Sequence, residues 1–194
     1  IVPGLLGVIL TMTMTLMTAI SLTREAERGT MENLLAMPVK PVEVMIGKIA
    51  PYIGIGFVQV SIILLAAHFV FGVPMMGSFT ALFVGLTAFI ATNLALGYTF
   101  STIARSQMQA MQMTFFFFLP SILLSGFMFP FRGMPEWAQV LGQAIPVTHF
   151  LRIVRGALLK GQGLEDQWRD LAALLAFVCV VTALAMVRFR RTLD

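Results

Sequence analysis

The sequence "EAERGTMENLLAMPVKPVEVMIGK", Glu25 to Lys48, separates two long apolar runs and holds nearly all the charge of the first hundred residues. On either side of it, residues 1–23 and 49–104 contain no Asp, Glu, Lys or Arg. An apolar run of about 20 residues is long enough to cross a bilayer as a helix. The quoted stretch is therefore interpreted as the polar connection between two membrane-spanning helices.

The composition of the whole chain agrees with this interpretation. Of 194 residues, 58% are hydrophobic and only 11% are charged, which is typical of a membrane protein. The one cysteine, Cys179, lies in an apolar run, so neither a disulfide framework nor a metal cluster is expected. The net charge of +4 is attributed to membrane topology, and nucleic acid is not expected as a partner.

The charged residues divide the chain into five predicted spans. The uncharged run after Lys48 is too long for one crossing, and "FGVPMMGS", Phe71–Ser78, supplies a turn in its middle. The predicted spans are about 1–23, 44–71, 78–103, 107–126 and 170–188. Five crossings place the two ends of the chain on opposite sides of the membrane.

The distribution of Lys and Arg predicts the orientation. Cytoplasmic connections of membrane proteins carry an excess of these residues close to the span ends. One predicted side has short segments with Arg24, Arg28, Lys40, Lys48, Arg105, Arg188, Arg190 and Arg191. This side, which includes the C-terminus, is therefore predicted to be cytoplasmic.

Within the quoted stretch, a short amphipathic helix is predicted at residues 30–37. Gly29 ends the preceding helix, Thr30 can cap the new one, and Pro38 stops it. Leu34 and Leu35 share its apolar face with Met31. One interpretation is an interfacial anchor, and the other is a lever through which a cytoplasmic partner moves two spans.

Two motifs resemble those of type-2 ATP-binding cassette (ABC) exporter permeases. The first motif consists of Glu27, Gly29, Thr30, Glu32, Leu34, Leu35 and Pro38. The second, "LLSGFMFPFRGMPEWAQVLGQAIPVTHFLRIVRGALLKG" at Leu123–Gly161, is similar to the outer segment of that family. The motifs occur in the family's order, and the pattern of spans covers the whole chain.

The resemblance implies an all-α integral membrane protein with a cytoplasmic coupling helix that docks on a separate ATPase subunit. Residues 1–194 would then be the C-terminal membrane portion of a permease, without the family's first span and extracytoplasmic domain. The ATPase-coupling residues would be Glu27, Gly29, Thr30, Met31, Glu32, Leu34, Leu35 and Pro38. The expected location is the cell membrane, by implication a bacterial inner membrane, and the expected partners are this ATPase, lipids and a second copy or a related permease.

No cofactor is expected in this chain itself. It has no G-x-x-x-x-G-K-[ST] phosphate loop, so ATP and Mg are expected in the partner ATPase. No catalytic or metal-binding residue is predicted: His149 with Glu136, Asp166 or Asp170 has no recognisable spacing of a membrane-embedded enzyme. Two alternatives stay open. One is an ion-coupled secondary transporter, which would be expected to carry Asp or Glu inside its spans, and the other is a membrane-embedded enzyme that uses its charged loops.

The outer segment, residues 134–160, is predicted to form an interfacial or re-entrant helical hairpin. Its first helix would start at Pro135, with Trp137, Val140, Leu141 and Ala144 on one face. The second, after Pro146, would place Val147, Phe150, Leu151, Val154 and Leu158 together. The hairpin is either a lid that seals the bundle or an exit gate, with Pro130, Pro135, Trp137, Pro146, Phe150, Arg152, Arg155 and Gly156 as the gate residues. In a gate, Arg152 and Arg155 could contact lipid phosphates or an acidic group of the substrate.

Polar residues within the spans are expected to face other helices or a dimer partner, because a polar group facing lipid is costly. Thr11, Thr15 and Thr18 share one helical face, and Asn93 and Gln112 lie in or beside later spans. The threonine hydroxyls can bond back to the preceding turn or across to a neighbouring helix. For the later amide side chains, interhelical hydrogen bonds are the expected role. The spans are rich in Met and Phe, so the predicted cargo is hydrophobic or amphipathic: a drug, a lipid or a lipid-linked molecule.

Overall fold

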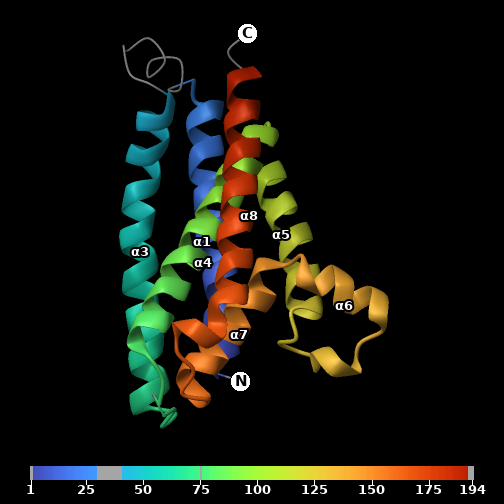
Figure 1. Ribbon diagram of the computed structural model, residues 1–194. Coiled ribbons are helices and arrows are strands. Elements are labelled where there is room, and N and C mark those ends of the chain that lie inside the picture. Colours follow the sequence, from blue (N-terminus) through green and yellow to red (C-terminus); the bar gives the residue numbers. More distant parts are fainter. Residues whose placement is uncertain (1, 30–40, 75, 192–194) are drawn as a thin grey trace.

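The computed structural model of the protein describes residues 2–29, 41–74 and 76–191, and every regular element within these ranges is a helix. The helices form an elongated bundle, with the short helices at one end (Figure 1). In chain order the elements are α1 (Val2–Glu27), α3 (Pro41–Phe69), α4 (Phe79–Ile103), α5 (Gln107–Leu124), the 3-10 turn η1 (Phe131–Gly133), α6 (Glu136–Gln143), α7 (Pro146–Leu159) and α8 (Leu164–Arg191).

Four of the described helices, α1, α3, α4 and α8, are long and apolar enough to cross a membrane. The predicted fourth span corresponds to α5, which has only 18 residues. Gln107, Gln109 and Gln112 occupy its first two turns and lower its hydropathy. The all-α membrane fold is thus supported, and the fifth crossing stays a prediction.

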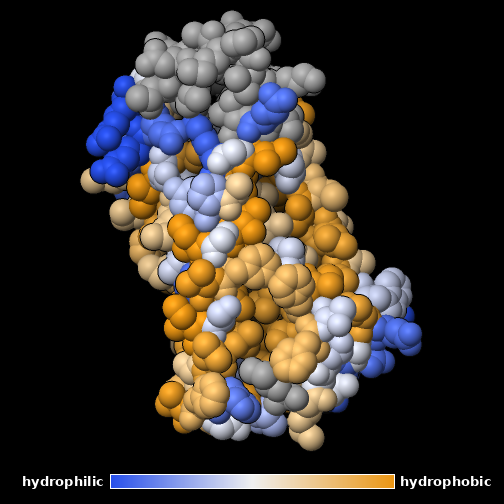
Figure 2. All heavy atoms as spheres, turned by 90° about the vertical axis from the view of Figure 1, so that its left-hand side faces the viewer, coloured by the Kyte–Doolittle hydropathy of each residue, from blue (hydrophilic) through white to orange (hydrophobic). Residues whose placement is uncertain are grey.

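The charged helix ends gather at one end of the bundle. There α1 ends, α3 begins, α4 leads into α5, and α8 ends, whereas α1 begins at the opposite end (Figure 1). We call the first the junction end and the second the α7 end. Between them, the face of the molecule on which α3 lies is mainly apolar (Figure 2). This arrangement suits a bundle embedded in a bilayer.

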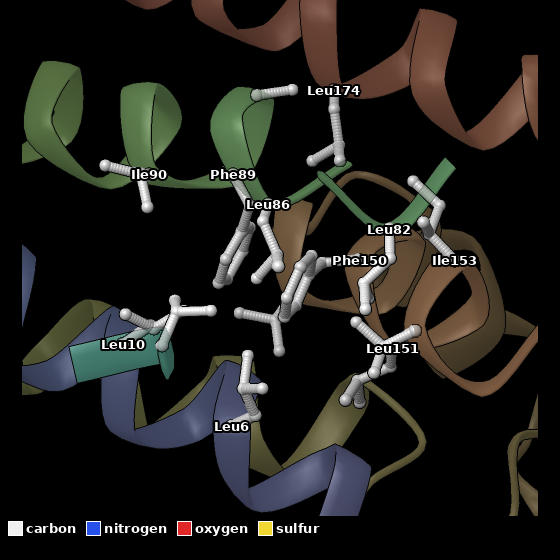
Figure 3. Packing of buried hydrophobic residues seen from close by; sticks show 14 of the residues in the cluster. Leu6, Leu10, Leu82, Leu86, Phe89, Ile90, Phe150, Leu151, Ile153 and Leu174 are labelled. Carbon is white, nitrogen blue, oxygen red and sulfur yellow. The ribbon is translucent and has the colours of Figure 1, made fainter. Parts of the chain in front are cut away.

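The core is formed where α1, α4 and α7 meet. Leu6 and Leu10 of α1, Phe89 of α4, and Phe150 and Val154 of α7 are each no more than 1% exposed (Figure 3). By contrast, large apolar side chains along α3, such as those of Val58 and Ile62, are more than 60% exposed. The outward side chains of α3 are thus positioned to contact hydrocarbon rather than protein.

Polar contacts join the central helices, as the sequence predicted. Thr15 Oγ1 of α1 donates a hydrogen bond to Asn93 Oδ1 of α4 over 3.2 Å, and Asn93 Nδ2 donates to Phe89 O over 2.9 Å. The two helices approach closely at Gly97, where an added Cβ would lie 2.8 Å from Thr18 Cβ. Thr13 Oγ1 and Gln59 Oε1, 3.0 Å apart, connect α1 and α3 in the same way.

Helix α8 extends beyond the predicted fifth span, about 170–188. It begins at Leu164, and Glu165 and Asp166 in its first turn suit the helix N-terminus electrostatically. Gln112 is exposed on α5. It therefore does not face the interior of the described bundle.

Candidate functional site

At the junction end, the chain leaves the membrane helix α1 through a glycine turn. Gly29 has a φ of +69°, and its backbone N–H donates to Ala26 O over 3.2 Å. A left-handed conformation just after a helix favours glycine, which has no Cβ to clash. The structure therefore agrees with the prediction that Gly29 ends this helix.

Glu27 fastens the end of α1 to the start of α5. One carboxylate oxygen accepts a hydrogen bond from the backbone N–H of Gln107 at 2.8 Å, and the other accepts from Gln107 Nε2 at 2.5 Å. Backbone N–H groups at a helix start have no partner within the helix, so a carboxylate stabilises that end. In the structure Glu27 thus caps a local backbone amide.

A second polar contact connects α1 with α3. Lys48 and Glu25 form an ion pair between the last turns of α1 and the early turns of α3. Together with the Glu27–Gln107 contact, it fixes the helices on both sides of residues 30–40. The other predicted coupling residues, Thr30, Met31, Glu32, Leu34, Leu35 and Pro38, lie outside the described residues, as does the coupling helix at 30–37.

At the opposite end, α7 enters the bundle. Its predicted apolar face is confirmed as buried: Val147, Phe150, Leu151, Val154 and Leu158 are at most 2% exposed. The ring of Phe150 stacks on that of Phe89, with centroids 3.9 Å apart and an interplanar angle of 3°. Pro146 occupies the first turn of α7, where no amide donor is needed. The buried face makes α7 part of the core, which favours the re-entrant alternative over a helix lying only on the surface.

Helix α6 differs from α7 in its packing. Its small residues Ala138 and Gly142 are buried, whereas Trp137, Val140 and Leu141 on its apolar face are 65%, 68% and 53% exposed. The predicted apolar face is therefore turned away from the described protein, in the manner of a helix lying against lipid. Trp137 consequently lies apart from Phe150, although both were predicted as gate residues.

Three arginines line a pocket between η1 and α7. The pocket has a volume of about 300 Å³. Its lining residues are Ser125, Gly126, Pro130, Phe131, Arg132, Thr148, Leu151, Arg152 and Arg155. We call it the arginine pocket.

Two of these arginines, Arg152 and Arg155 of α7, contact residues of other segments. Arg155 Nη2 donates to Gly126 O over 3.3 Å, and the Arg152 guanidinium lies 5.0 Å from the centre of the Phe131 ring. Arg152 Nη1 also contacts Asp170 Oδ1 at 3.4 Å. The same carboxylate is 2.7 Å from Nδ1 of His149, whose Nε2 is 2.8 Å from Gln143 O. Asp170 of α8 thus contacts two side chains of α7, and one of these, His149, also contacts the last residue of α6.

The predicted gate residues are only partly brought together. Pro130, Arg152 and Arg155 line the arginine pocket, while Pro135 directly precedes α6 and Trp137 is on it. Gly156 faces α8, where an added Cβ would lie 3.3 Å from Cδ of Gln167. Arg132, Ser125 and Thr148 also line the pocket but were not predicted from the sequence. The charge of Arg132, inside the motif Leu123–Gly161, was the available signal.

An apolar groove lies between α3, α4 and α8. Its volume is about 220 Å³. The lining residues are Ile46, Ile49, Ala50, Ile53, Ala91, Leu94, Ala95, Tyr98, Val178, Thr182 and Ala185. None of them carries a charge at neutral pH, so this surface suits hydrocarbon.

Comparison with known proteins gives a family match over most of the chain. The model of a family described as "ABC-2 type transporter" matches residues 1–159. The chain is 31% identical over 191 residues to "Probable multidrug ABC transporter permease YbhR" of Escherichia coli (strain K12), covering 98% of this chain and 52% of that protein. It is 33% identical over 194 residues to "Inner membrane transport permease YhhJ" of the same strain, covering 98% and 52%. The chain thus spans about half the length of these relatives.

Proposed function

Because the chain belongs to the ABC-2 type transporter family, we propose that it is the membrane-spanning part of a permease that exports a hydrophobic or amphipathic molecule. The family match carries this proposal, since it contains the whole junction-end motif and nearly all of the outer segment. The relatives named as transport permeases support the same activity.

The energy for transport would come from a separate ATPase subunit that binds ATP and Mg. In this proposal, residues 30–37 form the coupling helix, and its apolar face docks on the ATPase at the cytoplasmic junction end. The two contacts that fix Glu25 and Glu27 support the proposal, because they join the ends of α1, α3 and α5. A displacement of the coupling helix would therefore move the ends of α1, α3 and α5 together.

The α7 end would be the outer exit gate, and assembly with a second copy or a related permease would complete the pathway. Helix α7 packs against α1, α4 and α8. A movement of α1 or α4 would therefore be transmitted directly to α7, which forms part of the proposed gate. The uncharged groove between α3, α4 and α8 supports an apolar cargo, a drug, lipid or lipid-linked molecule, because it offers hydrocarbon a surface without charge.

The experiment that tests this function is transport by the full-length protein with its ATPase in inverted membrane vesicles. ATP-dependent uptake of a fluorescent amphipathic compound is expected, and a substitution of the phosphate-loop Lys in the ATPase should abolish it. A protonophore should leave the uptake unchanged. Uptake that continues with the inactive ATPase and disappears with the protonophore would instead support an ion-coupled secondary transporter.

A further inference from the structure

The arginine pocket combines three positive side chains with a lining that contains no carboxylate. We propose that it is a binding site for a phosphate group, presented at the α7 end by an anionic amphiphile. The proposal follows from the charge of the pocket, from its hydrogen-bond donors and from the apolar surface beside it.

The charge of the pocket is only partly neutralised by the surrounding protein. Arg155 contacts a neutral carbonyl, that of Gly126, and Arg152 contacts Asp170, which His149 also contacts. For Arg132 the described residues provide no ion pair. Three guanidinium groups gathered at one small cavity repel one another, and an anion between them removes that repulsion.

The pocket also has the donors that a phosphate requires. Each guanidinium carries five N–H donors and binds phosphate oxygens in a forked geometry. Arg155 uses one donor for Gly126 O, and Arg152 one for Asp170. The remaining donors are available for an oxyanion with several acceptor oxygens, and such charge-assisted hydrogen bonds are among the strongest in proteins.

The wall of the pocket is fixed by buried hydroxyl groups. Thr148 Oγ1 donates to Gly142 O over 2.6 Å, and Ser125 Oγ donates to Ile122 O over 3.2 Å. Both residues are at most 3% exposed. The pocket is thus preformed around the arginines, which lowers the entropy that a ligand must lose.

Apolar side chains next to the pocket indicate that the phosphate is attached to a hydrocarbon chain. Met128 and Phe129 directly precede Pro130 of the lining, and they are 59% and 54% exposed. A free phosphate ion would gain nothing from this surface, whereas an acyl chain would cover it. The inference rests on the proposed function only for the side of the membrane on which the pocket lies.

The test is a binding titration with the full-length protein in a maltoside detergent, without ATP or the ATPase. Dioctanoyl phosphatidic acid, dioctanoylglycerol and inorganic phosphate are titrated separately by calorimetry. Phosphatidic acid should bind, and dioctanoylglycerol, which has the same chains without phosphate, should not. Arg155→Gln or Arg132→Gln should weaken phosphatidic acid binding about tenfold, the loss expected for one charge-assisted contact.

The matched control is Arg169→Gln, which removes an arginine of α8 that lies over Trp168 and outside the pocket. It should leave binding unchanged. If inorganic phosphate binds more weakly than phosphatidic acid and competes with it, the lipid-borne source is supported, whereas equal affinity would overturn the hydrocarbon part of the inference.

The phosphate site itself would be overturned by equal binding of dioctanoylglycerol. It would also be overturned if Arg132→Gln, an exposed position where folding should not suffer, left phosphatidic acid binding unchanged. Failure of export would affect neither result, because no step of the titration involves transport.

Discussion

Phe150 of α7 and Phe89 of α4 stack face to face, with ring centroids 3.9 Å apart, although 61 positions separate them in the sequence (150 − 89). Gly7 of α1 lies beside this stack, since an added Cβ there would be 3.0 Å from Cδ1 of Phe150. The contact therefore fixes α7 against two long helices at once (Figure 3).

Phe150→Ala is expected to destabilise the full-length protein by about 3 kcal/mol, near the lower end for such truncations in cores. The lower end applies because, in a membrane, packing rather than transfer from water supplies much of the stabilisation. Thermal unfolding in detergent measures the effect. Trp137→Ala is the control, since Trp137 is 65% exposed and should matter far less. Equal losses for both variants would show that α7 is not a core element.

The hydrogen bond between Thr15 and Asn93 should contribute modestly to the packing of α1 on α4. Thr15→Val keeps the shape of the side chain but leaves Asn93 Oδ1 without this donor, so a loss of about 0.6–1.5 kcal/mol is expected. Unfolding in mixed micelles with increasing dodecyl sulfate measures it. Thr11→Val is the matched control, because the Thr11 hydroxyl donates within its own helix, to Gly7 O at 2.8 Å. A larger loss for Thr11→Val would contradict the assignment.

The contact of Glu27 with Gln107 should protect the first turn of α5. Glu27→Ala removes the carboxylate that accepts from the Gln107 amide, so hydrogen–deuterium exchange of residues 107–110 is expected to become faster. Glu25→Gln, which weakens the contact with Lys48 instead, should leave exchange at 107–110 unchanged. Unchanged exchange in Glu27→Ala would mean that this contact does not hold the junction together.

Local periodicity predicted the secondary structure and the buried side of α7, because a helix repeats its faces every 3.6 residues. The same periodicity grouped Trp137 with Val140 and Leu141 on α6, but it could not tell whether that face meets protein or lipid. Both environments are apolar, so hydropathy does not distinguish them. The small residues Ala138 and Gly142, which allow close approach, mark the packed side instead.

Contacts between distant segments were not predictable in this way. Gln107 follows Glu27 by 80 positions, and nothing in either local pattern indicates that they meet. Of the three arginines that line the pocket, Arg152 and Arg155 were predicted as gate residues. Arg132 was not, because it belongs to a different element, η1. Family resemblance supplied the proposed function, since polarity and spacing alone left an anchor and a lever open for residues 30–37.

The topology gives a test of the fifth crossing by α5. If α5 spans the membrane, the chain after α8 and the loop between α3 and α4 lie on opposite sides. Reporters of sidedness fused after Asp194 and inserted next to Gly72 should then give opposite signals, with the C-terminal one cytoplasmic. Reporters placed next to Gly133 and Gly72 should agree with each other. Identical signals at Asp194 and Gly72 would exclude five crossings.

The proposed coupling helix predicts which variants separate ATP hydrolysis from export. Leu34→Asp and Leu35→Asp place a charge on the face expected to dock on the ATPase, where each buried leucine contributes about 1.5–3 kcal/mol. We expect the permease to insert normally but to lose ATPase binding and export, as measured by co-purification and by uptake into inverted vesicles. Asn33→Asp adds the same charge on the opposite face of the predicted helix and should be nearly neutral. An interfacial anchor predicts a different result, lower abundance or altered topology with coupling intact. Full export and normal ATPase binding by a well-inserted double variant would therefore leave residues 30–37 without a coupling role.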